Sequence, residues 1–161
     1  MDTLKEIPSA RDWGDFSSDR DVRYAHEKFF GKNLDEALIR FENHVLSACE
    51  DLRFMPEIPF RYYMLSFKNY LAGPQFLETY EACDAASCFL GLVLDKLDNS
   101  FDDIAPILSE IMPTVEYVAK NQVLFDADVE IYGDFNEKLS EIKQMMNKAK
   151  SSLDAERFRV D

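Results

Sequence analysis

Apolar residues recur at every third or fourth position over most of this 161-residue chain, and this spacing restricts its fold more than any other feature. The clearest stripe follows Asn33, a residue type that favours the start of a helix, and ends before Pro56. Its members are Leu34, Leu38, Phe41, Val45, Ala48 and Leu52. Further stripes cover residues 60–71, 75–97, 104–118 and 135–153. No segment alternates apolar and polar residues over a strand's length, so the chain is predicted to be all-α.

Short connections between these segments predict a single-domain bundle of about five or six helices over residues 33–155. Residues 1–32 carry aromatic residues without a sustained helical period. They predict a partly irregular N-terminal arm, with one short helix over residues 19–30. Ser100 and Asp103 predict a capping box, and Pro106 and Pro113 predict a kinked or split fourth helix. Residues 156–161 are expected to form a frayed tail.

The apolar stripes are interrupted by charged residues or proline well before the roughly eighteen residues that a membrane span needs. The N-terminal residues are acidic where a secretory signal is basic and then apolar. A cytoplasmic protein is therefore expected. Cys49, Cys83 and Cys88 have no metal-ligand spacing and are interpreted as reduced cysteines packed in the core. No metal and no cofactor is predicted.

Negative charge is concentrated in one part of the sequence. The chain has a formal net charge of −13, and residues 75–134 carry thirteen acidic residues against Lys96 and Lys120. Such a field repels nucleic acid and anionic membranes and attracts basic proteins. A basic protein partner is thus expected, and binding to nucleic acid or to a membrane is not. The alternative for these acids is a solvated surface that maintains solubility.

The residues expected to contact such a partner come from two acidic stretches. They are Asp95, Asp98, Asp102, Asp103, Asp126, Asp128 and Glu130. Tyr62 and Tyr63 are neighbours in a predicted helix and must point about 100° apart. We therefore expect one of them to reach the surface and to provide an aromatic contact.

The second acidic stretch resembles an EF-hand calcium loop. With Asp126 as position one, oxygen-bearing residues fall at positions three, five, nine and twelve, as Asp128, Glu130, Asp134 and Glu137. Position six, however, is Ile131, where the loop requires glycine for its sharp turn. The favoured interpretation is a structural turn in which Gly133 makes the bend and Asp134 caps the last helix.

Catalytic patterns are weak. The spacing from Arg40 to His44 superficially resembles the motif of HEPN ribonucleases, but only three residues intervene where that family has four to six. His26 and His44 also lack the glutamate three positions earlier that di-iron bundles use. The sequence therefore predicts a non-enzymatic acidic protein that binds a basic protein, as immunity proteins and inhibitors do. The alternative is an enzyme or small-ligand-binding bundle with a pocket between helices, using His44 or Tyr63 with a carboxylate. A third possibility is a subunit that self-associates through remaining apolar surface.

Overall fold

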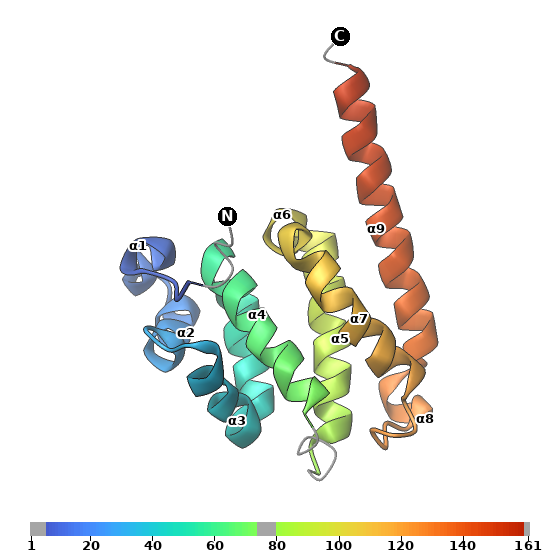
Figure 1. Ribbon diagram of the computed structural model, residues 1–161, viewed down its shortest axis with the longest axis horizontal. Helices are drawn as coiled ribbons and strands as arrows, with labels where there is room; N and C mark the ends of the chain where they lie inside the picture. The colour runs from blue at the N-terminus through green and yellow to red at the C-terminus, as the bar shows by residue number, and fades with distance from the viewer. Residues whose placement is uncertain (1–5, 74–79, 160–161) are drawn as a thin grey trace.

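The computed structural model describes residues 6–73 and 80–159, which form helices and connecting turns without a β-strand (Figure 1). The α-helices are α1 (Ala10–Trp13), α2 (Arg20–Phe29), α3 (Leu34–Phe54), α4 (Glu57–Ala72), α5 (Ala82–Asn99), α6 (Phe101–Ile104), α7 (Leu108–Lys120), α8 (Val129–Tyr132) and α9 (Phe135–Phe158). Short 3-10 helices cover Phe16–Ser18 and Ala105–Ile107. The all-α prediction is confirmed. The predicted count of five or six helices is too low, because it omits the short helices α1, α6 and α8.

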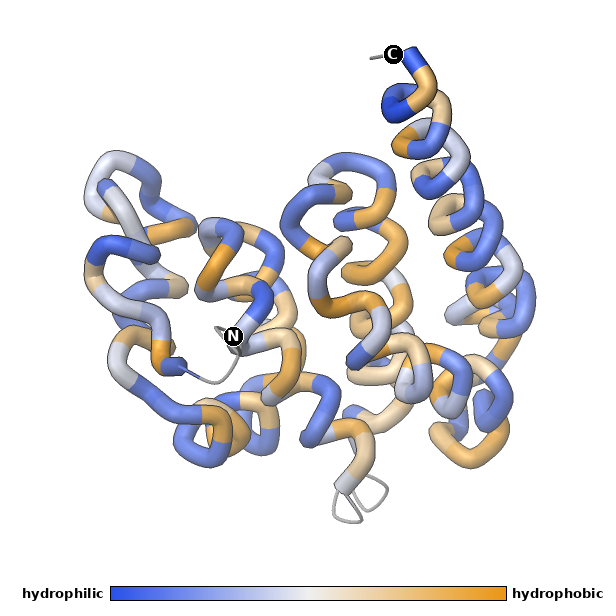
Figure 2. Tube along the Cα trace, turned by 45° about the horizontal axis from the view of Figure 1, so that its top comes forward, coloured by the Kyte–Doolittle hydropathy of each residue, from blue (hydrophilic) through white to orange (hydrophobic). Residues whose placement is uncertain are grey.

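The helices lie side by side in a row, from α1 and α2 at one end to α9 at the other (Figure 1). α4 packs against α3 and α7, and α5 packs against α3, α7 and α9. The fully buried rings of Phe41, Phe67 and Phe89 join α3, α4 and α5, with centroid separations of 4.9 and 5.3 Å. Figure 2 shows hydrophobic residues concentrated along the central helices, whereas α2 is mostly hydrophilic. The core therefore runs through the middle of the row.

The N-terminal arm is more regular than predicted. Its described part contains α1, a 3-10 turn and α2, and the short helix predicted over residues 19–30 is confirmed as α2. Trp13 is buried, and the His26 ring stacks between Phe16 and Phe30 at centroid distances of 3.6 and 4.5 Å. These aromatics show no common period because they come from separate elements that converge on one cluster.

α3 is bent at His44, which the sequence did not predict. His44 has φ −149° and ψ 59°, so the helical conformation is broken at this residue, and the two parts of α3 meet at an angle (Figure 1). Arg40 Nη2 lies 3.1 Å from Asp51 Oδ2 across the bend. In a straight helix, eleven residues would separate these positions by about 16 Å along the axis, so the bend brings the pair together.

Only some of the predicted helix boundaries lie at prolines in the structure. The split predicted near Pro106 is confirmed, because Pro106 lies in the 3-10 turn before α7, whereas Pro113 lies inside α7. The helix predicted over residues 75–97 corresponds to α5, which begins at Ala82, and residues 75–79 lie outside the described residues.

The frayed tail predicted after residue 155 is not observed over the described residues. α9 continues to Phe158 and extends past the body of the molecule on the side of α6 (Figure 1). Residues 151–159 are all exposed, so tertiary packing does not hold this part of α9. None of the helices in the described part of the chain is long and apolar enough to cross a membrane.

Candidate protein-binding site

The structure places the two acidic stretches that are predicted to contact one partner in separate regions. Residues 95–103 lie at the end of α5 and in α6, whereas residues 126–130 lie beside α8 (Figure 1). α7 connects the two regions, and its 13 residues span about 20 Å. The seven predicted contact residues therefore form two groups at opposite ends of α7.

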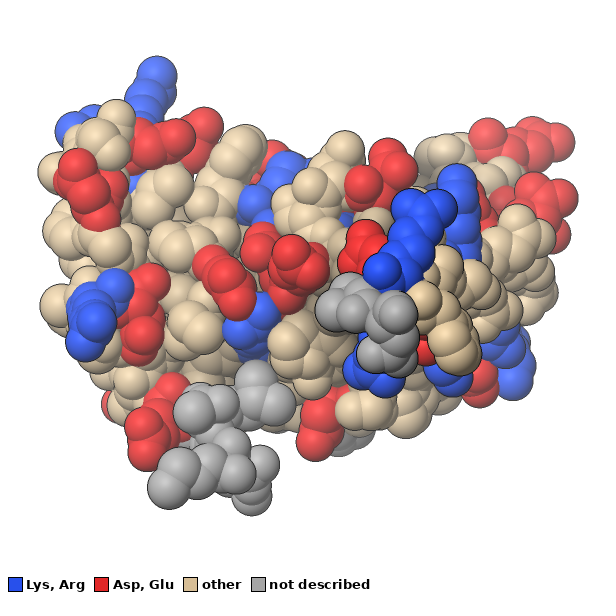
Figure 3. All heavy atoms as spheres, turned by 90° about the horizontal axis from the view of Figure 1, so that it is seen from above, with Lys and Arg blue, Asp and Glu red and all other residues tan. Residues whose placement is uncertain are grey.

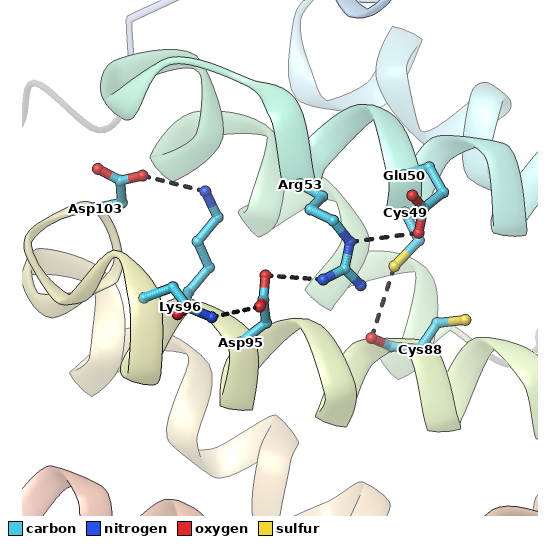
Figure 4. A network of polar contacts seen from close by, with 8 residues as sticks. Cys49, Glu50, Arg53, Cys88, Asp95, Lys96 and Asp103 are labelled. Carbon is cyan, nitrogen blue, oxygen red and sulfur yellow. Dashed lines mark hydrogen bonds and ion pairs between the residues drawn. The ribbon is translucent and has the colours of Figure 1, made fainter. Parts of the chain in front are cut away.

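At the α6 end, two of the predicted residues are used inside the protein. Arg53 Nη1 donates a hydrogen bond to Asp95 Oδ2 at 2.8 Å, and Lys96 Nζ donates to Asp103 Oδ2 at 3.1 Å (Figure 4). Lys96 is buried and also lies 4.5 Å from the ring centroid of Phe60. Neutralised carboxylates of this kind contribute little long-range field, so Asp95 and Asp103 are poor candidates for attracting a partner.

Asp98 and Asp102 remain exposed at this end, and their carboxylates have no ion-pair partner among the described residues. Seen from above, the acidic groups are separated by uncharged surface and interspersed with lysine and arginine (Figure 3). The surface at this end is therefore not a continuous acidic face.

The capping box predicted for Ser100 and Asp103 is wrong. The Ser100 side chain makes no capping hydrogen bond, and its backbone carbonyl accepts from the Asp103 amide at 2.9 Å. The Asp103 carboxylate binds the ammonium group of buried Lys96 and is therefore not used to cap the helix.

The predicted aromatic contact of Tyr62 and Tyr63 is also wrong, since both side chains are buried. The Tyr63 hydroxyl lies 2.6 Å from the carbonyl oxygen of Phe29 and 2.8 Å from that of Lys32, and burial raises the pKa of Tyr63. α4 is covered on several sides by the arm, α3 and α7, so neighbouring residues on it can both be buried. Tyr63 therefore anchors the arm and presents no hydroxyl to a ligand.

The region that follows α7 carries an exposed aliphatic cluster that sequence reasoning missed. In the 121–134 loop, which connects α7 to α9 and includes α8, Val123, Leu124, Val129 and Ile131 expose 93, 51, 55 and 74% of their surface. The turn that follows α7 is correspondingly hydrophobic in Figure 2. The predicted residues Asp126, Asp128 and Glu130 alternate with these aliphatics and are all exposed. The 121–134 loop thus combines apolar and acidic side chains on one exposed segment.

Buried Gln122 fixes the backbone of the 121–134 loop. Its Nε2 donates to the carbonyl oxygens of Ala127 at 3.0 Å and Gly133 at 2.8 Å, and its Oε1 accepts from the Phe135 amide at 2.9 Å. One side chain therefore connects the start, the middle and the end of the loop.

Further contacts hold the loop at both ends. Asp128 caps α8, and the prediction that Gly133 makes the bend and Asp134 caps the last helix is confirmed, with Gly133 at φ 78°. The Tyr132 hydroxyl donates to Asp84 Oδ1 at 2.6 Å, and this hydrogen bond raises the pKa of Tyr132. Asp126 has φ 55°, a conformation that non-glycine residues seldom adopt and that costs free energy.

A hollow of about 400 Å³ lies beside the loop, with Val123, Leu124 and Val129 on its wall. Its shape offers space for a side chain of a partner.

Two residues of the sequence that resembles a calcium loop have other roles in the structure: the carboxylate of Asp128 caps α8 and that of Asp134 caps α9. No cluster of three or more metal-ligating side chains occurs among the residues that the structure describes.

The remaining candidate for chemistry is His44, which is exposed at the bend of α3. It lines a shallow groove of about 350 Å³ together with Arg40 and Ile39.

The comparisons with known proteins found no matching family model, no matching curated protein and no matching solved structure.

A signal for the aliphatic cluster exists in the sequence. Four aliphatic residues fall within nine positions of a segment that has no helical period, so they cannot all belong to a core-facing stripe.

Proposed function

We propose that this protein binds another protein through the 121–134 loop, and that the partner combines an apolar patch with basic residues. The observation that carries the proposal is the exposure of four aliphatic side chains on a loop whose backbone is fixed by buried Gln122. Contiguous exposed apolar surface marks interaction sites on proteins that are otherwise well packed. A fixed loop also loses little conformational entropy when it binds.

Charge defines the second property of the partner. Asp126 and Glu130 are exposed, and their carboxylates have no ion-pair partner within the described part of the chain. The segment from residue 75 to residue 134 carries most of the net negative charge. Such a field accelerates association with a basic surface and weakens as salt is added. The role is that of a non-enzymatic binding protein, of the kind that neutralises a basic enzyme by covering it.

The partner can be identified by photo-crosslinking in cells. A benzophenone amino acid at position 131 should give a specific adduct, whereas the same group at Asn147, an exposed residue of α9, should not. An adduct that forms equally at both positions would indicate non-specific contact.

Two variants of the 121–134 loop then separate the apolar and the electrostatic contributions. Val123→Ser with Ile131→Ser should weaken binding by about tenfold or more, mainly by faster dissociation. Asp126→Lys with Glu130→Lys should mainly slow association, and the difference should shrink at high salt. The matched control for charge is Glu137→Lys with Glu141→Lys, two exposed residues on α9. Binding that is unaffected by both loop variants would refute the proposal.

A further inference from the structure

Two of the three cysteines lie close together where α3 packs against α5. The Cys49 thiol donates a hydrogen bond to the carbonyl oxygen of Cys88 at 3.6 Å (Figure 4), and the two thiol groups are close enough to shift each other's pKa. Cys49 is buried, whereas Cys88 is only half-buried. A small reagent that approaches from solvent therefore reaches Cys88 first.

The surroundings divide the two thiols into different roles. The hydrogen bond from Cys49 lowers the pKa of Cys88, and Arg53 acts in the same direction, although burial and nearby Asp84 and Glu50 oppose them. The same hydrogen bond, followed by burial, raises the pKa of Cys49. Since the thiolate is the nucleophilic form and Cys88 is the more accessible of the two sulfur atoms, Cys88 is assigned as the member that reacts first, with Cys49 beside it.

We propose that Cys49 and Cys88 form a reversible disulfide bond when the protein meets a peroxide. In the first step the Cys88 thiolate attacks one oxygen of hydrogen peroxide, the O–O bond breaks, and a sulfenic acid and hydroxide are formed. In the second step the sulfur of Cys49 attacks the Cys88 sulfur and displaces its hydroxyl group, which leaves as water with the Cys49 proton. Together two thiols lose two electrons, and one peroxide becomes two waters.

The bond would connect two helices that are already packed together. A disulfide requires a sulfur–sulfur distance of about 2.05 Å, so the Cys88 side chain has to rotate toward Cys49. α4 lies within the closed loop, and so the oxidised form constrains α3, α4 and α5 as one unit. Cys83, also on α5, lies beside Tyr132, with the hydroxyl oxygen 3.2 Å from its sulfur, and serves as an internal control.

The test is peroxide treatment of the full chain, followed by alkylation of free thiols, trypsin digestion without reductant and mass spectrometry. Trypsin places Cys49 in peptide 41–53 and places Cys83 and Cys88 together in peptide 69–96. The two peptides should be recovered linked and short of two hydrogen atoms, and a dithiol reductant should separate them. Cys83→Ser should leave the linked species unchanged, whereas Cys88→Ser should remove it.

Cys49→Ser supplies a second readout that does not depend on the linked peptide. In this variant the sulfenic acid on Cys88 has no resolving thiol and should accumulate, so that dimedone labels residue 88 more strongly than in the wild-type chain. The proposal is overturned if both thiols remain free to alkylation after peroxide treatment. It is equally overturned if the linkage joins Cys49 to Cys83, or if Cys88 labels with dimedone to the same extent in both chains.

Discussion

Replacement of Gln122 by methionine tests whether one buried side chain fixes the loop that we propose as the binding site. Methionine has a similar length and volume, so the change removes polar atoms without opening a large cavity. Two donated hydrogen bonds and one accepted hydrogen bond are lost, and their backbone partners at Ala127, Gly133 and Phe135 lose their Gln122 contact.

Each of these neutral hydrogen bonds contributes about 1 kcal/mol to the free energy of unfolding. The expected loss for Gln122→Met is therefore about 3 kcal/mol, which corresponds to a decrease in Tm of roughly 6–12 °C for a chain of this size. Urea denaturation followed by far-ultraviolet circular dichroism measures the free energy. Hydrogen exchange at the Phe135 amide measures the loop directly, and its protection should fall more than that of amides in the middle of α5.

Gln144→Met is the matched control, because Gln144 is exposed on α9 and the same chemical change there should alter the free energy of unfolding by less than about 0.5 kcal/mol. A loss below about 1 kcal/mol for Gln122→Met, or unchanged exchange at Phe135, would refute the reasoning. Either result would mean that the loop is held by its caps and by the Tyr132 contact alone.

Three further predictions concern other parts of the fold. Asp103→Ala leaves buried Lys96 without its carboxylate and should lower the free energy of unfolding by about 2–3 kcal/mol in urea denaturation; adding Lys96→Met should recover most of the loss. Tyr63→Phe should cost about 1–2 kcal/mol in the same assay and increase proteolysis within the arm, because the Tyr63 hydroxyl binds backbone carbonyls there. Burial lowers the pKa of His26, so the unfolded chain binds a proton more readily than the folded chain does. The free energy of unfolding should therefore fall as the pH decreases through about 6.5, and His26→Phe should reduce this dependence in thermal melts between pH 5 and 8.

Most of the helices could be predicted because their stripes are long and are bounded by proline, glycine or capping residues. The bend at His44 could not, because no proline or glycine marks it in the sequence. Its consequence is the ion pair between Arg40 and Asp51, which sequence spacing alone places about three turns apart on one straight helix.

The site could be predicted only in part, for two physical reasons. Charge counts by segment cannot show that α7 separates Asp102 from Asp126, or that the Asp103 carboxylate forms an ion pair with buried Lys96. Periodicity identifies residues that belong to a core stripe, and it does not identify aliphatic residues that a loop holds in solvent. The charge pattern predicts Asp126 and Glu130 as contacts, whereas the sequence only indicates that Val123 and Ile131 lie off the core stripe, and the structure establishes their exposure.

The energetics of the 121–134 loop favour a binding role over that of a simple connection. A connection needs only polar residues, yet this loop exposes Val123 and Ile131 and keeps Asp126 in a left-handed conformation that costs about 1–3 kcal/mol. It also places the polar side chain of Gln122 in a buried position, where every hydrogen bond has to be satisfied. These features do not improve the packing of the core, but together they fix apolar side chains in water before a partner arrives. If the loop were only a connection, Val123→Ser with Ile131→Ser would leave the protein's interactions unchanged; if it is a preformed contact, the same variant should remain as stable and lose its partner.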